Sequence, residues 1–332
     1  RSFREKNLGE IQLIGLQHIN LKKASEEIRL RLKKIEQEKV QTTISEEVKS
    51  DLKDAPYAHL HNHSQFSVLQ STIAINDLVK ATAKFKMPAV AMTDTGNMMG
   101  AFHFVSAVMT HNNKAAKTKI EAAIAAGEEP TEIEIKPIVG CEFNICEDHK
   151  DKTKKDNGNQ VVLLAKNKKG YHNLAKMSSI AYTDGFYYVP RIDKKIVEQY
   201  KEDIMVLSGN LYGEIPSKIL NVGESQAEEA LIWWKEQFGS DFYLELMRHK
   251  QEDENRVNQT LIAFAKKHNV KLIATNNTYY VNKEDANAHD ILLCVKEGEK
   301  QATPIGRGRG YRYGLPNQEY YFKSGEEMKQ LF

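Results

Sequence analysis

The residues with the clearest chemical potential are three histidines in the segment HLHNHS at 59–64. In an extended strand, the side chains of residues i and i+2 point to the same face. His59, His61 and His63 would therefore present three imidazoles on one face. Imidazole is a common nitrogen ligand for zinc and similar metals, so this spacing favours a metal site. A single histidine is more often a core or surface residue, but three at alternating positions are harder to explain that way.

Two carboxylates occur in comparable settings further along the chain. Asp94 lies in TDTGN at 93–97, where it ends an apolar run and precedes a glycine turn. It suits either a metal ligand or a cap for a following helix. Glu142, in GCEF at 140–143, alternates with apolar neighbours. A carboxylate in such a strand requires a partner, a metal or solvent.

A segment rich in arginine, glycine and tyrosine, GRGRGYRYG at 306–314, is the other candidate. Arg307, Arg309 and Arg312 alternate with glycines and tyrosines. Arginine and aromatic side chains on a flexible backbone suit phosphates and bases. The segment lacks the GxxxxGK[ST] pattern of a Walker loop. A nucleic-acid contact, a domain interface and a solvated loop all stay open for it.

The elements that would position these residues alternate between short apolar strands and helices. Strands are predicted at 89–94, 136–145, 161–167, 203–209, 242–247 and 270–276, and helices at 76–86, 224–238 and 254–268. This alternation favours an α/β fold with a mainly parallel sheet and helical crossovers. A barrel and a large doubly wound sheet both fit, and in either the site is expected where strands end.

Other segments depart from that rhythm. Residues 1–55 are predicted to form a helical arm or linker, because 21–40 carries apolar residues at helical spacing among charged ones. Residues 109–135 are a helix-prone insertion, and 147–159 a charged surface loop. We expect a main domain at 56–295, followed by a linker at 296–332.

The composition limits the class of protein. The chain has 332 residues, and 47 Lys and Arg against 45 Asp and Glu leave a net charge of +2, which argues against a polycation that coats nucleic acid. Three cysteines without a CxxC pair argue against a disulfide framework and fit a reducing compartment. No apolar run approaches the roughly 18 residues of a membrane helix. The chain begins with Arg1 and has no signal-peptide pattern, so we expect a fragment of a cytoplasmic protein.

Three long motifs occur in order: HLHNHSQFSVL, PAVAMTDTGNMMGAFHF and KPIVGCEFNI. Together they resemble the polymerase and histidinol phosphatase (PHP) domain, and more closely the amino-terminal PHP domain of bacterial replicative, C-family DNA polymerase III alpha subunits. The resemblance continues through LIATNNTYYVNKEDANAHDILLC at 272–294, and EYYFKSGEEMKQLF at 319–332 resembles the entry to the polymerase palm. It implies a PHP-type distorted (β/α)7 barrel with a metal cluster at the strand ends, and a linker into the palm at 296–332.

The resemblance also assigns the ligand positions of the metal-binding members. His61 and His63 match the two histidines of the first motif, and Glu142 matches the family carboxylate. The other ligand positions hold Gln70, Thr95, Gln160, Asn210, Asn277 and Tyr279. Amide and hydroxyl groups are weaker ligands, and a cluster of cations needs bridging anions. We therefore expect a vestigial site without phosphoesterase activity, in which one zinc on His61, His63 and Glu142 is the remaining metal-binding option.

Two functions of different classes follow from this resemblance. The first is a non-catalytic scaffold in DNA replication, within a DNA-directed DNA polymerase (a nucleotidyltransferase) whose magnesium-dependent palm lies outside these residues. Its partners would be the remaining polymerase domains of the same chain, DNA through the parent, a proofreading exonuclease and other replicase subunits, with no membrane. The second is a metal-dependent phosphoesterase, a 3′–5′ exonuclease or a phosphatase, with a reduced metal site.

Overall fold

The computed structural model describes residues 55–126, 134–306 and 308–332. The predicted helical arm at 1–55 lies outside these residues apart from Ala55, and so do Arg307 and residues 127–133 of the predicted insertion. Within the described residues, no helix combines the length and the apolar character needed to cross a membrane. The three cysteines are buried and free.

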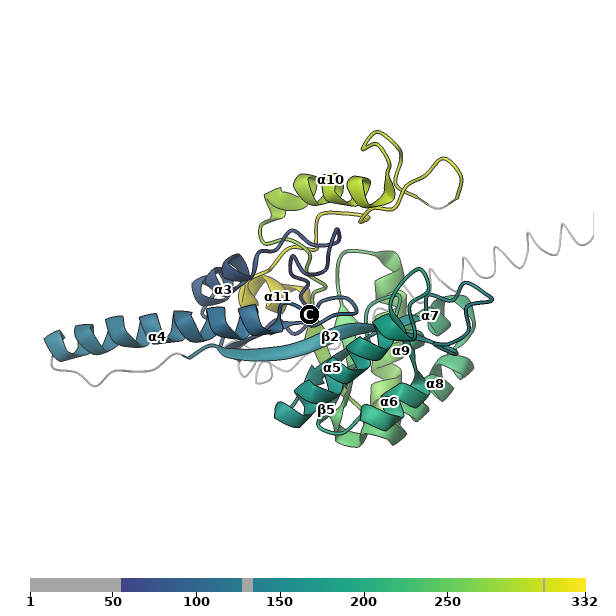
Figure 1. Ribbon diagram of the computed structural model, residues 1–332, viewed down its shortest axis with the longest axis horizontal. Helices are drawn as coiled ribbons and strands as arrows, with labels where there is room; N and C mark the ends of the chain where they lie inside the picture. The colour runs from purple at the N-terminus through teal and green to yellow at the C-terminus, as the bar shows by residue number, and fades with distance from the viewer. Residues whose placement is uncertain (1–54, 127–133, 307) are drawn as a thin grey trace, which may run out of the picture. The chain divides into compact units, whose positions relative to one another are not determined.

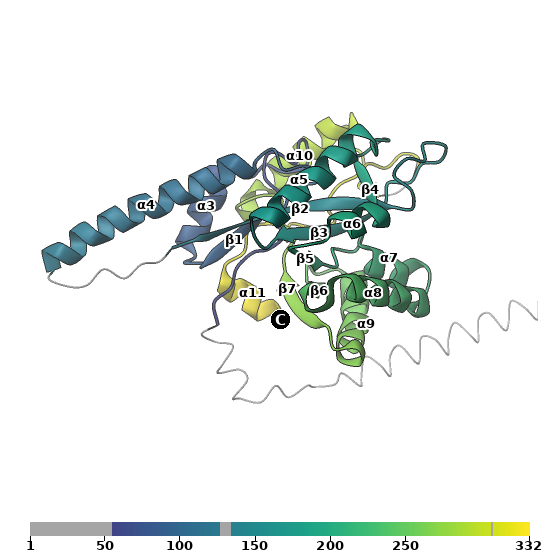
Figure 2. The ribbon, with the colours of Figure 1, turned by 60° about the horizontal axis from the view of Figure 1, so that its bottom comes forward.

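Seven strands form one curved sheet, which Figure 2 shows most clearly. They are β1 (Ala89–Met92), β2 (Lys136–Cys146), β3 (Asn159–Ala165), β4 (Arg191–Asp193), β5 (Ile204–Leu207), β6 (Phe242–Met247) and β7 (Lys271–Thr275). The order across the sheet is β1-β2-β3-β5-β6-β7, and β4 pairs with the end of β2.

The segment 59–63 joins the two edges of this sheet. On one side, Ala91 N donates to His59 O (2.9 Å), next to β1. On the other side, His63 N donates to the carbonyl oxygen of Thr278 (3.0 Å), just beyond β7. The histidine segment thus closes the sheet into a distorted barrel, which confirms the predicted fold. It does so through isolated bridges instead of the regular strand expected from its sequence.

One strand departs from the predicted parallel arrangement. The pairs β1–β2, β2–β4, β5–β6 and β6–β7 are parallel, whereas β3 runs antiparallel to both β2 and β5. The chain passes from β2 to β3 through the charged loop, which contains no helix. An antiparallel neighbour needs no crossover helix, whereas a parallel one usually does.

The helices are α3 (Ile75–Lys84), α4 (Ala101–Ala126), α5 (Lys168–Thr183), α6 (Lys194–Tyr200), α7 (Glu214–Asn221), α8 (Glu224–Phe238), α9 (Glu252–His268), α10 (Ala286–Glu297) and α11 (Gly325–Leu331). Helices α5 to α9 lie against this sheet, whereas α10 stands apart from it (Figure 1). The largest apolar cluster lies between the sheet and α5, α7, α8 and α9, and contains Trp234, Phe242 and Leu261. The predicted insertion continues α4 as a single helix to Ala126.

The residues that line the interior of the barrel are polar toward one end and apolar toward the other. We call one end the mouth, defined by the buried polar residues His61, His63, Glu142 and Glu245. We call the other end the floor, defined by the apolar residues Leu60, Ile138, Leu164, Met205, Tyr243 and Ile273.

A tightly packed layer lies between the mouth and the floor. Ala91 and Val162 are fully buried there. A Cβ atom on Gly140 of β2 would lie 2.6 Å from Leu164 Cδ2 and 2.7 Å from the carbonyl oxygen of Leu163. The glycine of GCEF is therefore required by the close approach of β2 and β3, two residues before Glu142.

Candidate metal centre at the mouth of the barrel

The mouth brings the three matched ligand residues into one cluster. His61 and His63 come from the closing segment, and Glu142 comes from β2. His61 Nε2 lies 3.1 Å from Glu142 Oε2, and His63 Nε2 lies 3.9 Å from the same oxygen. All three side chains are fully buried, and their ligand-type atoms lie within 4.8 Å of one another.

The geometry of this cluster fits one cation. Zinc bonds of about 2.0–2.2 Å in a tetrahedral arrangement place neighbouring ligand atoms roughly 3.3 Å apart. The two distances to Glu142 Oε2 lie on either side of that value. Two imidazoles and one carboxylate would leave the fourth position open, as in catalytic zinc sites.

Glu245 of β6 is a residue of this site that the sequence reasoning missed. Its carboxylate accepts hydrogen bonds from His61 Nδ1 (2.8 Å), the Thr275 hydroxyl (2.6 Å) and Gly209 N (3.0 Å). A carboxylate on the far nitrogen of a histidine fixes the orientation of the ring and is common behind metal-binding histidines. The available signal was the lone carboxylate in the apolar strand FYLELM.

The two carboxylates determine the charge of His61. Burial disfavours the imidazolium form, but the negative charges of Glu245 and Glu142 and their hydrogen bonds outweigh burial and raise the pKa of His61 to about 10. Burial acts against the charged form of Glu142 as well, yet the adjacent imidazoles and the Thr95 hydroxyl lower the pKa of this carboxyl. In the protein without a bound cation, His61 thus carries the positive charge between two carboxylates.

His63 has the opposite protonation state, and its contacts define the tautomer. The Ser67 hydroxyl donates to Asp94 Oδ1 (2.6 Å), and the Thr95 hydroxyl donates to Glu142 Oε1 (3.1 Å). Both hydroxyl oxygens lie 3.3 Å from His63 Nδ1, so they accept its proton. Burial lowers the pKa of His63, which favours the neutral ring. Its Nε2 lone pair is buried and has no hydrogen-bond partner among the described residues.

Five of the six replaced ligand positions line the mouth. Thr95 contacts both Glu142 and His63, as described above. Asn210 Nδ2 donates to Gln160 Oε1 (2.8 Å) and lies 3.5 Å from Glu142 Oε2. Asn277 Nδ2 donates to Tyr279 Oη (3.3 Å), and the Tyr279 ring stacks on His63 at 4.4 Å between centroids. Neutral side chains thus occupy the positions at which the resemblance predicts metal ligands.

Gln70 is the sixth replaced position, and it contacts its neighbours through its backbone. His289 Nε2 donates to the carbonyl oxygen of Gln70 (2.7 Å). This bond ties the loop after the histidine segment to α10.

Two further candidates from the sequence have positioning roles. His59 Nε2 donates to the carbonyl oxygen of Lys323 (2.7 Å), and its ring lies 4.2 Å from that of Phe322, so it does not join His61 and His63. Asp94 accepts from the backbone N–H (2.6 Å) and hydroxyl (2.7 Å) of Ser64. Asp94 therefore holds the histidine segment in place.

The arginines of the 306–314 segment lie in different environments. The Arg312 guanidinium is buried and forms two bonds with Asp290 of α10, at 2.7 and 2.8 Å. Arg309 is exposed, and Arg307 lies outside the described residues. The pairing of Arg312 with Asp290 favours a packing role over a nucleic-acid contact for this residue.

A family model and several curated proteins match this chain over more than half of its length. The PHP domain family model matches residues 59–249. The DNA polymerase III subunit alpha of Borreliella burgdorferi is 38% identical over 280 residues, which cover 83% of this chain and 22% of that protein. The corresponding subunit of Deinococcus radiodurans is 32% identical over 285 residues, which cover 82% of this chain and 19% of that protein. The chain thus spans about a fifth of the length of these relatives.

Among solved structures, a Bifidobacterium adolescentis protein provisionally described as a metal-dependent phosphoesterase aligns with a TM-score of 0.41 and 12% identity, over 78% of this chain and 93% of that one.

The family model match includes the histidine segment and Glu142 and runs to just beyond β6, which is more than half of the chain. The chain therefore belongs to the PHP domain family and is similar over most of its length to DNA polymerase III alpha subunits.

Proposed function

We propose that this chain is the PHP region of a DNA polymerase III alpha subunit and serves there as a non-catalytic scaffold in DNA replication. The observation that supports this role is the network of neutral side chains at the mouth. Thr95, Gln160 and Asn210 stand where ligands would be needed, and they hydrogen bond to Glu142 or to one another. A mouth of this kind contributes stability to the fold without supplying the chemistry of a metal cluster.

The number of carboxylates at the mouth argues against more than one cation. Cations held close together need bridging anions. Glu142 is the one carboxylate that faces both His61 and His63 among the described residues. Glu245 and Asp94 each accept three hydrogen bonds from neighbouring groups. These bonds occupy three of the about four acceptor sites on each carboxylate, which leaves little capacity to bridge a second ion.

The proposal also covers the activity and the partners of the parent protein. It would extend a primer by nucleotidyl transfer with magnesium ions held in a palm domain outside these residues. Its other domains, DNA, a proofreading exonuclease and further replicase subunits are the proposed partners, and the cytoplasm is the proposed location. The similarity to polymerase III alpha subunits over most of the chain supports this assignment.

A hydrolysis assay tests the scaffold role. The full chain is incubated with 3′-labelled single-stranded DNA, and separately with p-nitrophenyl phosphate, in zinc, manganese or magnesium. We expect no hydrolysis above that of the His61→Ala/His63→Ala double variant. Metal-dependent turnover that is lost in the double variant would contradict the proposal, provided that it persists in His172→Ala, which changes an exposed histidine.

A mononuclear phosphoesterase is the second candidate, and one observation favours it. His63 Nε2 and Asn277 Oδ1 are buried atoms, and neither has a partner in good hydrogen-bond geometry among the described residues. Both are acceptor atoms at the mouth, and a bound cation would satisfy acceptors of this kind. A single zinc on His61, His63 and Glu142 would polarise a phosphate oxygen or lower the pKa of a bound water. Turnover in zinc with the mutant pattern just described would place this candidate first.

A further inference from the structure

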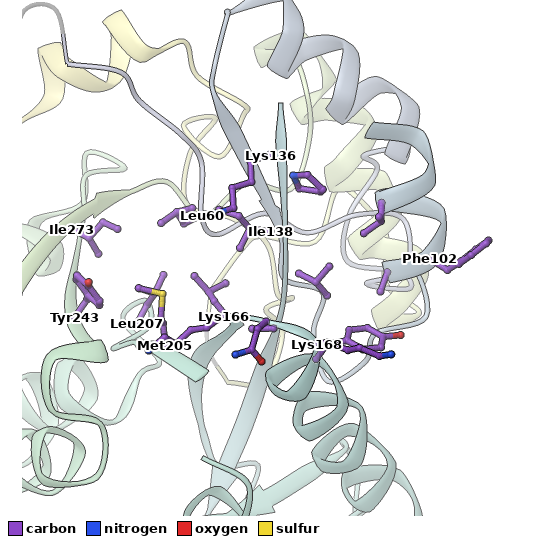
Figure 3. Close-up of a pocket in the computed structure, with 18 residues that line it drawn as sticks. Leu60, Phe102, Lys136, Ile138, Lys166, Lys168, Met205, Leu207, Tyr243 and Ile273 are labelled. Atoms are coloured by element: carbon purple, nitrogen blue, oxygen red, sulfur yellow. The ribbon is translucent and has the colours of Figure 1, made fainter. Parts of the chain in front are cut away.

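The floor of the barrel contains a hollow of about 900 Å³. Figure 3 shows its lining, with Tyr243 and Ile273 on one side and Lys168 on the other. Leu60, Ile138 and Met205 also line it. These residues pack against the inner apolar cluster of the barrel but remain partly exposed.

We propose that this hollow is a docking groove for an acidic peptide segment of a partner protein, which inserts bulky apolar side chains into the floor. The inference deepens the proposed scaffold role and rests on it, because a scaffold acts through what it binds. The groove itself lies at the opposite end of the barrel from the candidate ligands. The metal content of the mouth and the binding properties of the floor can therefore be measured separately.

Most of the residues that line the hollow are apolar. Interior barrel positions are normally filled by packed side chains. Here the layer around Gly140 is filled, whereas the next layer toward the floor is open. Apolar surface exposed to water is unfavourable, and contiguous apolar patches commonly mark interaction sites.

The charges around the hollow indicate the charge of the segment that would bind there. Its eighteen lining residues include Lys136, Lys166 and Lys168 but no aspartate or glutamate. Lys166 pairs with Asp241 at 2.7 Å. Lys136 and Lys168 are exposed and form no salt bridge within the described part of the chain. An apolar segment flanked by carboxylates would complement both the lining and these lysines.

The extent of the surface favours a peptide over a small molecule. The hollow reaches from β6 and β7 to the starts of α4 and α5. Phe102 of α4 is 78% exposed and extends the apolar surface beyond the hollow, as Figure 3 shows. A groove with an apolar centre and an apolar rim on one side is suited to an amphipathic segment with several anchor residues.

Selection from a random peptide library tests the proposal. Peptides of about 16 residues displayed on phage are selected on the full chain and depleted on its Met205→Trp variant, in which the larger side chain fills the hollow. We expect enrichment of peptides in which Leu, Ile, Phe or Trp is flanked by Asp or Glu. Circular dichroism and thermal unfolding establish that the variant is folded.

A lysine variant provides a second readout that does not depend on filling the hollow. For a selected peptide, fluorescence anisotropy should give an affinity at least about fivefold weaker for Lys136→Ala/Lys168→Ala, because the rim charges are lost. The matched control Lys195→Ala/Lys266→Ala removes two exposed lysines from α6 and α9, outside the lining, and should change the affinity less than about twofold.

Three results would overturn the proposal. One is the absence of peptides that distinguish the chain from its Met205→Trp variant. Another is a selected set without carboxylates, or one whose affinity does not respond to the lysine variant. The third is a dimer of the chain in sedimentation analysis that Met205→Trp dissociates, because the occupant would then be a second copy of this chain.

Discussion

The two ends of the barrel are built from the same strands, yet they differ in polarity and in packing. On β2, Glu142 at the mouth is fully buried and accepts hydrogen bonds, while Ile138, four residues earlier, is partly exposed at the floor. On β6, Glu245 at the mouth is likewise buried and Tyr243 at the floor is partly exposed. The polar end is the closed one, and the apolar end is the open one.

The two ends differ in whether the residues that line them are satisfied by contacts within the chain. Buried polar groups are stable only when their hydrogen bonds are satisfied. At the mouth, Thr95 and Asn210 contact Glu142, Tyr279 stacks on His63, and these contacts meet most of that need without a cluster of cations. At the floor, hydrogen bonds within the chain cannot satisfy the partly exposed apolar lining, because only further apolar contacts would remove it from water.

The largest expected effect is at the mouth, in Glu245→Gln. The substitution removes the charge that orients His61 and leaves a buried imidazolium with one fewer carboxylate. We expect the free energy of unfolding in urea to fall by about 3–5 kcal/mol. The control Glu229→Gln changes an exposed residue of α8 and should stay within about 0.5 kcal/mol. A loss below about 1 kcal/mol for Glu245→Gln would mean that the mouth is not held by its carboxylates.

The packed layer between the two ends should be the next most sensitive. In Gly140→Ala, the new Cβ would meet Leu164 Cδ2 at 2.6 Å and the Leu163 carbonyl oxygen at 2.7 Å. The strands would have to separate, and we expect a loss of about 1–3 kcal/mol by denaturant unfolding. An unchanged stability would show that the interior is looser than the structure indicates and would weaken the contrast with the floor.

A buried carboxylate outside the barrel provides a comparison for the stability that the carboxylates of the mouth contribute. Glu214 of α7 bonds to Lys194 and Lys218 at 2.9 Å and accepts from Trp234 Nε1 at 2.8 Å. Burial opposes ionisation, but the two lysines outweigh it and lower the pKa of Glu214. Because the lysines are partly exposed, we expect Glu214→Gln to lose only about 1–2 kcal/mol at pH 7.

The pH dependence of that loss has a defined sign. A carboxyl group whose pKa is lower in the folded state stabilises the fold above its unfolded pKa and loses this contribution as the pH falls through its folded pKa. The difference between the wild type and Glu214→Gln should therefore shrink as the pH falls below the ordinary value of 4.5. A difference that grows in acid would contradict the assignment of Glu214 as an ion-paired carboxylate.

The smallest expected effect is at the floor, in Met205→Trp. The hollow of about 900 Å³ has room for the larger ring, so the free energy of unfolding should change by less than about 1 kcal/mol. Thermal and urea unfolding measure this change. A loss comparable to that of Gly140→Ala would show that the floor is as tightly packed as the layer above it.

The sequence predicts the residues of the mouth better than it predicts their supports. His61, His63 and Glu142 lie in recognisable motifs, and the structure brings them together. Glu245 has no motif of its own, and its importance appears only when β6 lies beside β7 and the histidine segment. The sequence leaves a nucleic-acid contact open for Arg312, but the structure pairs it with Asp290, twenty-two residues away in the chain, on α10.

Other features depend on tertiary geometry that no local pattern carries. The reversal of β3 depends on the path of the charged loop, which Arg191 holds by donating to the backbone oxygens of Asp151 and Asp156. The open floor depends on how the strands curve, since Ile138 and Ile273 have the sequence pattern of ordinary buried strand residues. Residue type alone therefore does not indicate which end of the barrel is closed.

The most direct test of the account is the metal content of the full chain, purified without chelator and dialysed against zinc and manganese. If the mouth is a scaffold, mass spectrometry should find less than about 0.1 metal ion per chain, because amides and hydroxyls are poor substitutes for anionic ligands. About one zinc, lost in His61→Ala/His63→Ala, would favour the mononuclear candidate. Two or more ions per chain would contradict the scaffold role, because Glu142 is the one carboxylate that faces both His61 and His63 among the described residues.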